Sequence, residues 1–563
     1  MAPIIPICER AVLRLKRWPG LMPVAVLLAQ PAVVAGASAA STLTMEQQRL
    51  GAYVEARMAE SDGAVQNAAR AYAQALRLDP ASPDIASRAF RQAVLAGDRA
   101  LALKAARALD AAGLSQPDSS VLLLIDAMAR SKWKEASALL ERIEQEGNFA
   151  FIVPFMQSWV SMKDGPYDPP VVPVDKPYAV FAVRYLEEQL LLQRLALGDG
   201  VGAADTFLQA RARGTAFGPA QRDAMAARFA ALGRADLARD LRGTMQPAST
   251  SCAAVSHDFT PQGGLSRLLA RLALDLIGQG DPTATLSIAR MASFADDTDD
   301  DVRLLVARAA LVADLYAEAR TEAEKAGPCS PAYLEAQSLR LRAMIASAED
   351  AEAVAEARRI AGAGDAHTLR LLGDVLSQTK DHKGAVVAYT QARALMQDKD
   401  DPALLLQLAA ALEQSGNWRD AKPLLEKVVE RAPDSTAALN YLGYAMADRG
   451  EDLPRAIALL ERANRIAPKE PAFIDSLGWA LFKAGQPDKA LPLIEGAVAA
   501  APGNAEINEH LGDILWALGR RFDARAAWRA ALVGLDADKG EDAVRMRINR
   551  KLDFGAEVPK PAS

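Results

Sequence analysis

The stretch that decides the fold is a phrase repeated four times: LAAALEQSGNWRDAKPLLEKVVERAP at 408–433, LGYAMADRGEDLPRAIALLERANRIAP at 442–468, LGWALFKAGQPDKALPLIEGAVAAAP at 477–502 and LGDILWALGRRFDARAAWRAA at 511–531. The second position of each phrase is small, and these residues stand 34, 35 and 34 positions apart: Ala409, Gly443, Gly478 and Gly512. A second small residue follows 12 or 13 positions later, and a bulky residue comes four positions after that. A period near 34 residues with small and large residues at fixed places is typical of stacked helical hairpins.

This spacing has a physical reason. Two antiparallel helices approach closely only where the residue at their crossing is no larger than glycine or alanine, and the bulky residue fills the space between hairpins. Helix ends are marked by residues that break a helix or accept a positive φ. These are Gly416, Gly485 and Gly519 after first helices and Pro433, Pro468 and Pro502 after second helices. The pattern resembles the tetratricopeptide repeat (TPR) and predicts an all-α, right-handed solenoid.

The clear repeats extend one unit upstream, because Gly373, Ala385 and Tyr389 follow the same spacing. We therefore expect five units over residues 366–536. A capping helix and a proline-rich tail are expected over residues 537–563.

The N-terminal half keeps a helical period but only eroded repeats. We expect degenerate TPR-like hairpins over residues 40–245 and further degenerate repeats over 265–365. The segment 246–264 is rich in proline, serine and glycine, which predicts a linker. The pattern leaves open whether the array is one continuous superhelix or two solenoids hinged near residue 255.

Composition and net charge argue against one class of partner. Charged residues make up 24% of the 563 and the formal net charge is -6. Phosphate binding needs clustered lysine and arginine, so the acidic balance argues against nucleic acid as the main partner.

The N-terminus has the pattern of an export signal over residues 1–39. A basic segment ends at Arg17, an apolar run covers Leu21–Val34, and Ala37 and Ala39 fit a cleavage site. We expect a periplasmic or otherwise exported protein without a lipid anchor, since no cysteine stands at the cleavage point. The alternative is an uncleaved anchor. No segment after residue 40 is apolar enough to predict a transmembrane helix.

No catalytic motif is found, so we expect neither an enzyme nor a cofactor or metal site. The histidines (His257, His367, His382 and His510) are scattered, and none is paired at a metal-ligand spacing. We interpret His510 as solvated or groove-facing. The acidic run Asp296–Asp301 lacks the glycine and glutamate of a calcium loop and is expected to cap the next helix.

Removal of the signal leaves two cysteines, Cys252 and Cys329, both in loops rich in proline and serine. Two cysteines in an exported protein suggest a disulfide. Two unpaired thiols too far apart to join are the alternative.

Three phrases carry a closer resemblance: LNYLGYAMADRG at 439–450, IDSLGWALF at 474–482 and INEHLGDILW at 507–516. They resemble the C-terminal repeats of a family of bacterial cell-envelope TPR proteins. Some envelope proteins of this kind are lipoprotein adaptors that hold a carboxy-terminal processing protease and present peptidoglycan hydrolases to it. The resemblance implies an envelope scaffold or adaptor, although this chain lacks the lipid-anchor cysteine. An accessory role in polysaccharide or peptidoglycan processing is the alternative.

The first helix of each hairpin is expected to line a concave groove that binds other proteins. Counting the small residue as the eighth position of a unit, the fifth, ninth and twelfth positions tend to face that groove. We therefore predict a partner-binding set formed by Asn440, Tyr444, Asp475, Trp479, Phe482, Glu509, Asp513 and Trp516. Packing between repeats is the alternative for Trp479 and Trp516.

Overall fold

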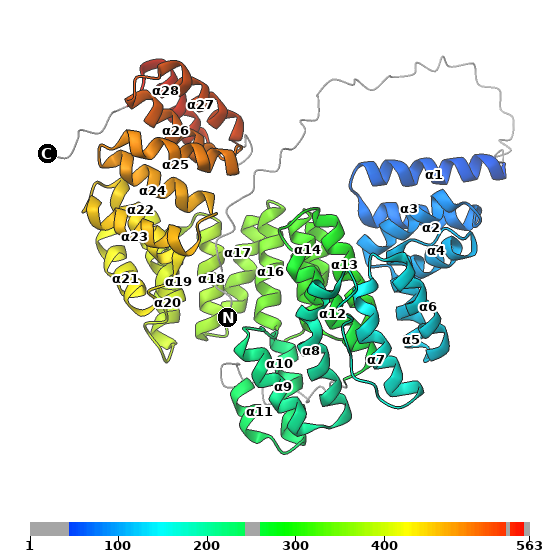
Figure 1. Ribbon diagram of the computed structural model, residues 1–563. Helices are drawn as coiled ribbons and strands as arrows, with labels where there is room; N and C mark the ends of the chain where they lie inside the picture. The colour runs from blue at the N-terminus through cyan, green and yellow to red at the C-terminus, as the bar shows by residue number, and fades with distance from the viewer. Residues whose placement is uncertain (1–43, 243–258, 536–540, 557–563) are drawn as a thin grey trace, which may run out of the picture. The chain divides into compact units, whose positions relative to one another are not determined.

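Residues 44–242, 259–535 and 541–556 are described by a computed structural model (Figure 1). Within these ranges all regular secondary structure is helical, which confirms the all-α class. The chain divides into two compact units, an N-terminal unit up to Arg359 and a C-terminal unit from Ile360. The predicted signal segment 1–39 lies outside the described residues.

The N-terminal unit contains seventeen α-helices and one short 3-10 helix within the described ranges. The first of them are α1 (Met45–Ser61), α2 (Val65–Leu78), α3 (Pro83–Ala96), α4 (Arg99–Ala111), α5 (Pro117–Ala129), α6 (Trp133–Glu146), η1 (Ala150–Ile152), α7 (Val153–Asp164), α8 (Ala179–Leu197) and α9 (Gly200–Ala212). The rest are α10 (Pro219–Ala231), α11 (Ala235–Arg242), α12 (Pro261–Leu276), α13 (Pro282–Ala295), α14 (Asp300–Val312), α15 (Tyr316–Ala323), α16 (Tyr333–Ala346) and α17 (Asp350–Ala361), whose last residues cross the unit boundary.

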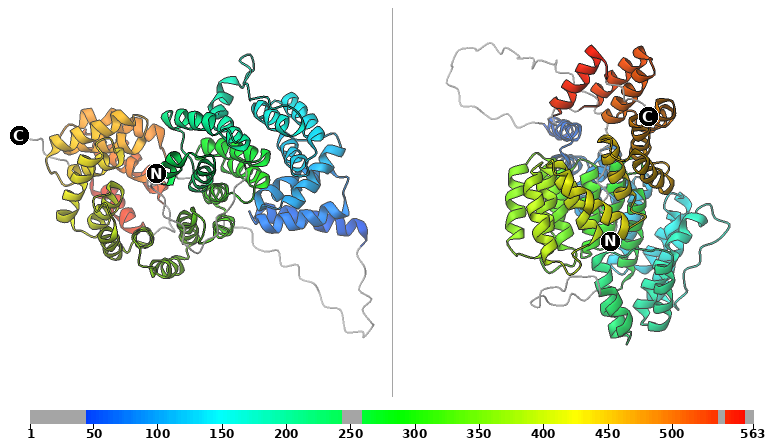
Figure 2. Two further views of the ribbon diagram at one scale, coloured as in Figure 1. Left: turned by 90° about the horizontal axis from the view of Figure 1, so that it is seen from below. Right: turned by 90° about the vertical axis from the view of Figure 1, so that its left-hand side faces the viewer.

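The C-terminal unit is a run of five hairpins followed by one helix (Figure 2). The hairpins are α18 (Ala366–Gln378) with α19 (His382–Leu395), α20 (Pro402–Gln414) with α21 (Trp418–Arg431), α22 (Thr436–Asp448) with α23 (Leu453–Ile466), α24 (Pro471–Lys483) with α25 (Pro487–Ala500), and α26 (Ala505–Ala517) with α27 (Arg521–Gly534). The final helix is α28 (Asp542–Phe554).

The small residues of the repeated phrase lie where the two helices of a hairpin meet. A Cβ on Gly478 would lie 2.6 Å from Ile494 Cδ1, and one on Gly443 would lie 2.7 Å from Leu460 Cγ. Both distances are below ordinary van der Waals contact, so a larger residue would push the helices apart. The small residue thus lies where the helices of one hairpin meet, as predicted, but the bulky residue packs over it inside the same hairpin, whereas the sequence predicted that it fills the space between hairpins.

One hydrophobic core joins the parts of the N-terminal unit on either side of the predicted linker 246–264. Trp159 on α7 donates from Nε1 to Gln189 Oε1 on α8 at 2.9 Å. Gln189 Nε2 in turn donates to the carbonyl of Gly264 on α12 at 3.0 Å. A hinge near residue 255 would divide this shared core. The helix α12 begins at Pro261, inside the range expected to be linker, because Thr260 caps it and proline is tolerated in the first helical turn.

The acidic run Asp296–Asp301 caps helices, as expected, and it caps two of them. Asp299 accepts from the backbone N–H groups of Asp301 and Val302 at the start of α14. Asp301 accepts from the N–H groups of Ala220 and Gln221 at 3.0 and 2.8 Å, at the start of α10. Arg267 lies 2.5 Å from Asp299 and 3.2 Å from Asp301, which balances the buried charge.

Cys329 lies in the exposed turn between α15 and α16 and is disulfide-bonded. Cys252 lies outside the described residues, so its pairing with Cys329 stays a prediction.

Candidate functional site

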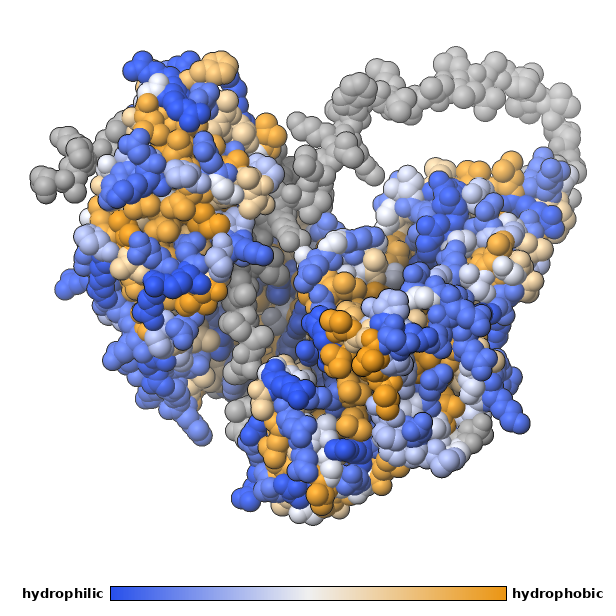
Figure 3. Space-filling view, in the orientation of Figure 1, coloured by the Kyte–Doolittle hydropathy of each residue, from blue (hydrophilic) through white to orange (hydrophobic). Residues whose placement is uncertain are grey.

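The first helices of successive hairpins lie side by side in the C-terminal unit, α22 against α24 and α24 against α26. We call the row formed by their fifth, ninth and twelfth positions the inner face. Hydrophobic residues gather over α24 and its neighbours on the face shown in Figure 3. The predicted partner-binding residues all belong to this row, so their surroundings decide which of them can reach a partner.

A buried ion pair occupies the centre of the inner face. Nδ1 of His510 on α26 lies 3.0 Å from both carboxylate oxygens of Asp475 on α24. A carboxylate can only accept, so Nδ1 carries the hydrogen. The ring of Trp479 stacks on the imidazole with centroids 4.0 Å apart and planes 16° apart. His510 is only 6% exposed, so its interpretation as a solvated residue is wrong.

Two further bonds hold this centre in place. Tyr444 on α22 donates from its hydroxyl to Glu506 Oε1 on α26 at 2.8 Å, passing across α24. Burial and the Glu506 carboxylate raise the pKa of the Tyr444 hydroxyl above its usual range, so it remains a donor. Trp479 Nε1 donates to Asp448 Oδ1 at 3.2 Å. Three consecutive first helices are thus joined through polar side chains.

The next part of the inner face is covered by α28. Arg547 donates to Glu509 at 2.7 and 2.8 Å, and Lys551 bonds both Glu509 and Asp513 at 2.6 Å. Trp528 on α27 donates from Nε1 to Asp513 Oδ1 at 3.0 Å. Burial raises the pKa of Glu509, but the bonds from Arg547 and Lys551 outweigh this effect and hold the pKa below its usual range. Burial raises the pKa of Asp513 despite the bond from Lys551. Both carboxylates are groups that α28 already binds.

The aromatic members of the predicted set also pack within the unit. Phe482 is buried, with its ring centroid 5.2 Å from that of Trp479. Trp516 is half-buried beside Trp528, with centroids 5.5 Å apart, and Arg521 lies over its ring. Trp479 contacts His510 of the next repeat, which is the packing between repeats given as its alternative. The ring contacts of Trp516 with Trp528 and Arg521 lie within its own hairpin.

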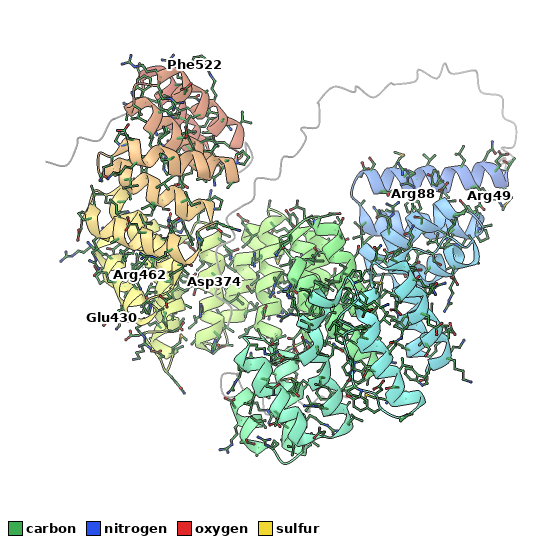
Figure 4. The ribbon with its side chains drawn as sticks, viewed as in Figure 1. Arg49, Arg88, Asp374, Glu430, Arg462 and Phe522 are labelled. Atoms are coloured by element: carbon green, nitrogen blue, oxygen red, sulfur yellow. The ribbon has the colours of Figure 1, made fainter. Side chains whose placement is uncertain are left out.

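At the other end of the unit the inner face is paired as well. Asp374 on α18, labelled in Figure 4, accepts from the Tyr389 hydroxyl at 2.7 Å and from Gln407 Nε2 at 2.6 Å. Arg370 Nε donates to Gln407 Oε1 at 2.6 Å. This network joins the first and second hairpins.

Asn440 is different. It is half-buried on α22, one turn before Tyr444, and its Oδ1 is buried without a hydrogen-bond partner. Leu406 and Ala410, at the fifth and ninth positions of the preceding first helix α20, are half-buried. Buried polar groups are nearly always bonded, so the Asn440 Oδ1 is an exception within this row.

The structure therefore divides the eight predicted residues. Seven of them contact partners within the chain, and Asn440 keeps an unpaired oxygen. Sequence reasoning missed several hydrogen-bonding partners of this set, among them Asp448, Glu506, His510, Arg547 and Lys551. A signal existed for His510, because it stands 35 positions after Asp475, one repeat period, at neighbouring positions of adjacent first helices.

The ion pair predicts a pH dependence of stability. Burial lowers the pKa of His510, but the Asp475 carboxylate outweighs this effect and raises the pKa to about 8. Because this value exceeds the unfolded pKa of about 6.5, the added stability is fully present below pH 6.5 and is lost as the pH rises through 8. We expect the free energy of unfolding to fall by about 2 kcal/mol across this window.

Urea unfolding at pH 6 and pH 9 measures this change, with His510→Gln as the comparison. The difference in free energy between wild type and variant should be larger at pH 6. An equal difference at both pH values would contradict the assignment.

Within the described ranges, no group of three or more histidine, cysteine, aspartate or glutamate side chains could hold a metal ion. No helix there has the length and hydropathy to cross a bilayer.

Comparison with known proteins adds to this geometry. Residues 406–471 and 476–542 match the tetratricopeptide repeat family. The TPR resemblance of these ranges is thereby confirmed, and TPR arrays are interaction surfaces for other proteins. The resemblance to an envelope family of adaptors stays a prediction.

Individual relatives cover smaller parts. A TPR repeat-containing protein of Pseudomonas aeruginosa is 32% identical over 119 residues, 21% of this chain and 20% of that protein. Human protein O-mannosyl-transferase TMTC1 is 26% identical over 179 residues, 31% of this chain and 20% of that protein. A thermophilic TPR protein of Thermus thermophilus, covered in full, matches 34% of this chain at 24% identity with a TM-score of 0.30. The chain thus spans about a fifth of the length of the curated relatives it matches.

Proposed function

We propose that the chain is a non-enzymatic scaffold that binds other proteins of the bacterial envelope through the inner face of its C-terminal unit. The observation that carries this proposal is the side-chain oxygen of Asn440, which is buried without a hydrogen-bond partner. An amide offers both a donor and an acceptor, which are the two groups that a peptide backbone presents. An extended partner segment lying along α20 and α22 would satisfy it.

The surroundings of Asn440 support this assignment. The polar groups of the inner face on α18, α24 and α26 are bonded within the chain, so a partner would have to break those bonds to use them. At Asn440 no bond has to be broken. Half-buried apolar residues at the fifth and ninth positions of the preceding first helix, Leu406 and Ala410, would add hydrophobic contact area for a partner that follows the row.

The envelope location and the kind of partner rest on the sequence. Residues 1–39 have the pattern of an export signal, and the phrases at 439–450, 474–482 and 507–516 resemble envelope adaptors. The proposed partners are therefore a carboxy-terminal processing protease or peptidoglycan hydrolases. Added protease should degrade the chain in spheroplasts, whereas a chain that stays intact while the spheroplasts are whole would contradict export.

Replacement of Asn440 by alanine tests the site. We expect Asn440→Ala to lower recovery of bound partners from crosslinked envelopes at least fivefold, because the backbone bonds of the partner are lost. The free energy of unfolding should stay equal or rise by up to about 1 kcal/mol, because an unpaired polar atom is removed from the interior. Mass spectrometry of affinity-purified complexes and urea unfolding measure the two effects.

A matched control is Asn549→Ala, which removes an exposed asparagine from α28. Recovery of partners should be unchanged in this control. Equal recovery from Asn440→Ala and the wild type would move the interface away from α22.

A further inference from the structure

The outer side of α27 exposes apolar side chains that take no part in packing the helix against its neighbours. Trp528, Ala524 and Ala531 are buried on the inner side, against α26 and α28. Phe522 and Val533 are 83% and 84% exposed, and Figure 4 labels Phe522 at the edge of its unit. We call the exposed stripe the α27 outer face, which is formed by Phe522, Arg525, Ala526, Arg529, Ala530 and Val533.

The α27 outer face also carries positive charge. The helix α27 carries three arginines and one acidic residue, Asp523, in a chain whose net charge is -6. Asp523 is bonded to Arg520. Within the described part of the chain, neither Arg525 nor Arg529 is joined to a carboxylate.

Two arginines of earlier second helices are paired with carboxylates of the chain. Arg431 on α21 lies 2.8 Å from Asp398, and Arg455 on α23 lies 2.8 Å from Glu426. Their charges are therefore balanced within the chain. The two arginines of the α27 outer face lie one helical turn apart and keep their positive charge available.

We propose that the α27 outer face binds the surface of an anionic lipid bilayer. Phe522 and Val533 enter the boundary between headgroups and acyl chains, and Arg525 and Arg529 bind lipid phosphates beside them. The apolar side chains project from a single helix as a ridge. A soft bilayer surface accepts such a ridge, whereas a folded protein would need a groove of matching shape.

This inference goes beyond the proposed scaffold function, since it concerns where the scaffold is held. The binding surface is on α27, while the proposed partner site is on α22. An attachment of this kind needs neither a lipid-modified cysteine nor a spanning helix.

Vesicle flotation with the full chain, purified as cells accumulate it, tests the proposal. The wild type should float with vesicles of phosphatidylglycerol and phosphatidylethanolamine at low salt, and binding should weaken at 0.5 M salt because the charges are screened. The triple variant Phe522→Ser, Arg525→Gln and Arg529→Gln should bind at least tenfold more weakly. This estimate uses roughly fivefold for each arginine near an anionic surface.

A double variant on α23, Arg465→Gln with Ile466→Ser, is the matched control. It removes another exposed arginine and its exposed apolar neighbour from a different second helix, one that lacks the second arginine and the phenylalanine of the α27 outer face. Binding should be unchanged in this control.

Two results would overturn the proposal. One is absence of wild-type binding to anionic vesicles. The other is equal binding by the wild type and the triple variant, which would place any lipid contact elsewhere, including residues 1–43. Neither result depends on recovery of protein partners, so the lipid proposal and the scaffold proposal can fail separately.

Discussion

Replacement of Trp528 by alanine is expected to cost about 3–5 kcal/mol of unfolding free energy and to open the last hairpin first. The Trp528 side chain is fully buried, packs on Gly512 and Ile548, and donates from Nε1 to Asp513. Alanine leaves a large cavity and removes one donor from a buried carboxylate. Because a repeat contacts only its neighbours in a solenoid, the loss should stay local.

Hydrogen exchange followed by mass spectrometry measures this effect. Peptides from α26, α27 and α28 should exchange much faster in Trp528→Ala, while peptides from α18 to α21 should keep their protection. The matched control is Phe522→Ala on the same helix, which removes an exposed ring and should change stability by no more than about 0.5 kcal/mol. Uniformly faster exchange across the C-terminal unit would contradict local opening.

Removal of His510 alone should be similarly costly. His510→Ala leaves the buried Asp475 carboxylate without its counter-charge, which typically costs about 3–5 kcal/mol. It also removes the ring on which Trp479 stacks. Replacement of both members by apolar residues, His510→Phe with Asp475→Leu, should recover much of this loss, because no buried charge remains unpaired.

Urea unfolding of His510→Phe, Asp475→Leu and the double variant measures the coupling. His367→Ala is the control, since that histidine is exposed at the start of α18 and should contribute little. If the double variant were as unstable as the sum of the two single variants, the pair would not be coupled. The ion-pair interpretation would then be wrong.

Much of the C-terminal unit was predictable because the relevant interactions are local and repeat. A glycine or alanine at the eighth position, as at Gly443, meets a bulky residue within the same hairpin. Both partners lie within about twenty positions of each other, so one repeat contains the information. The turn glycines behave likewise, with Gly416 at a φ of 87° and Gly519 at 79°.

The inner face was less predictable. The positions that form this row follow from the period. Whether each side chain there is paired depends on which group from another hairpin lies beside it. Tyr444 and Glu506 are 62 positions apart, and Glu509 meets Lys551 from a helix outside the repeats. Nothing in either local pattern indicates that these pairs meet.

The sequence by itself determined the helical class and the hairpin repeat, because a 34-residue period repeats the same local packing. The tertiary structure alone decided that α28 covers Glu509 and Asp513, that His510 is buried against Asp475, and that the Asn440 side-chain oxygen is left unpaired. The physical reason is that the burial and pairing of a charged or polar group depend on neighbours that the stacking of helices brings close. These neighbours are far apart along the chain, so the local sequence does not indicate that they meet.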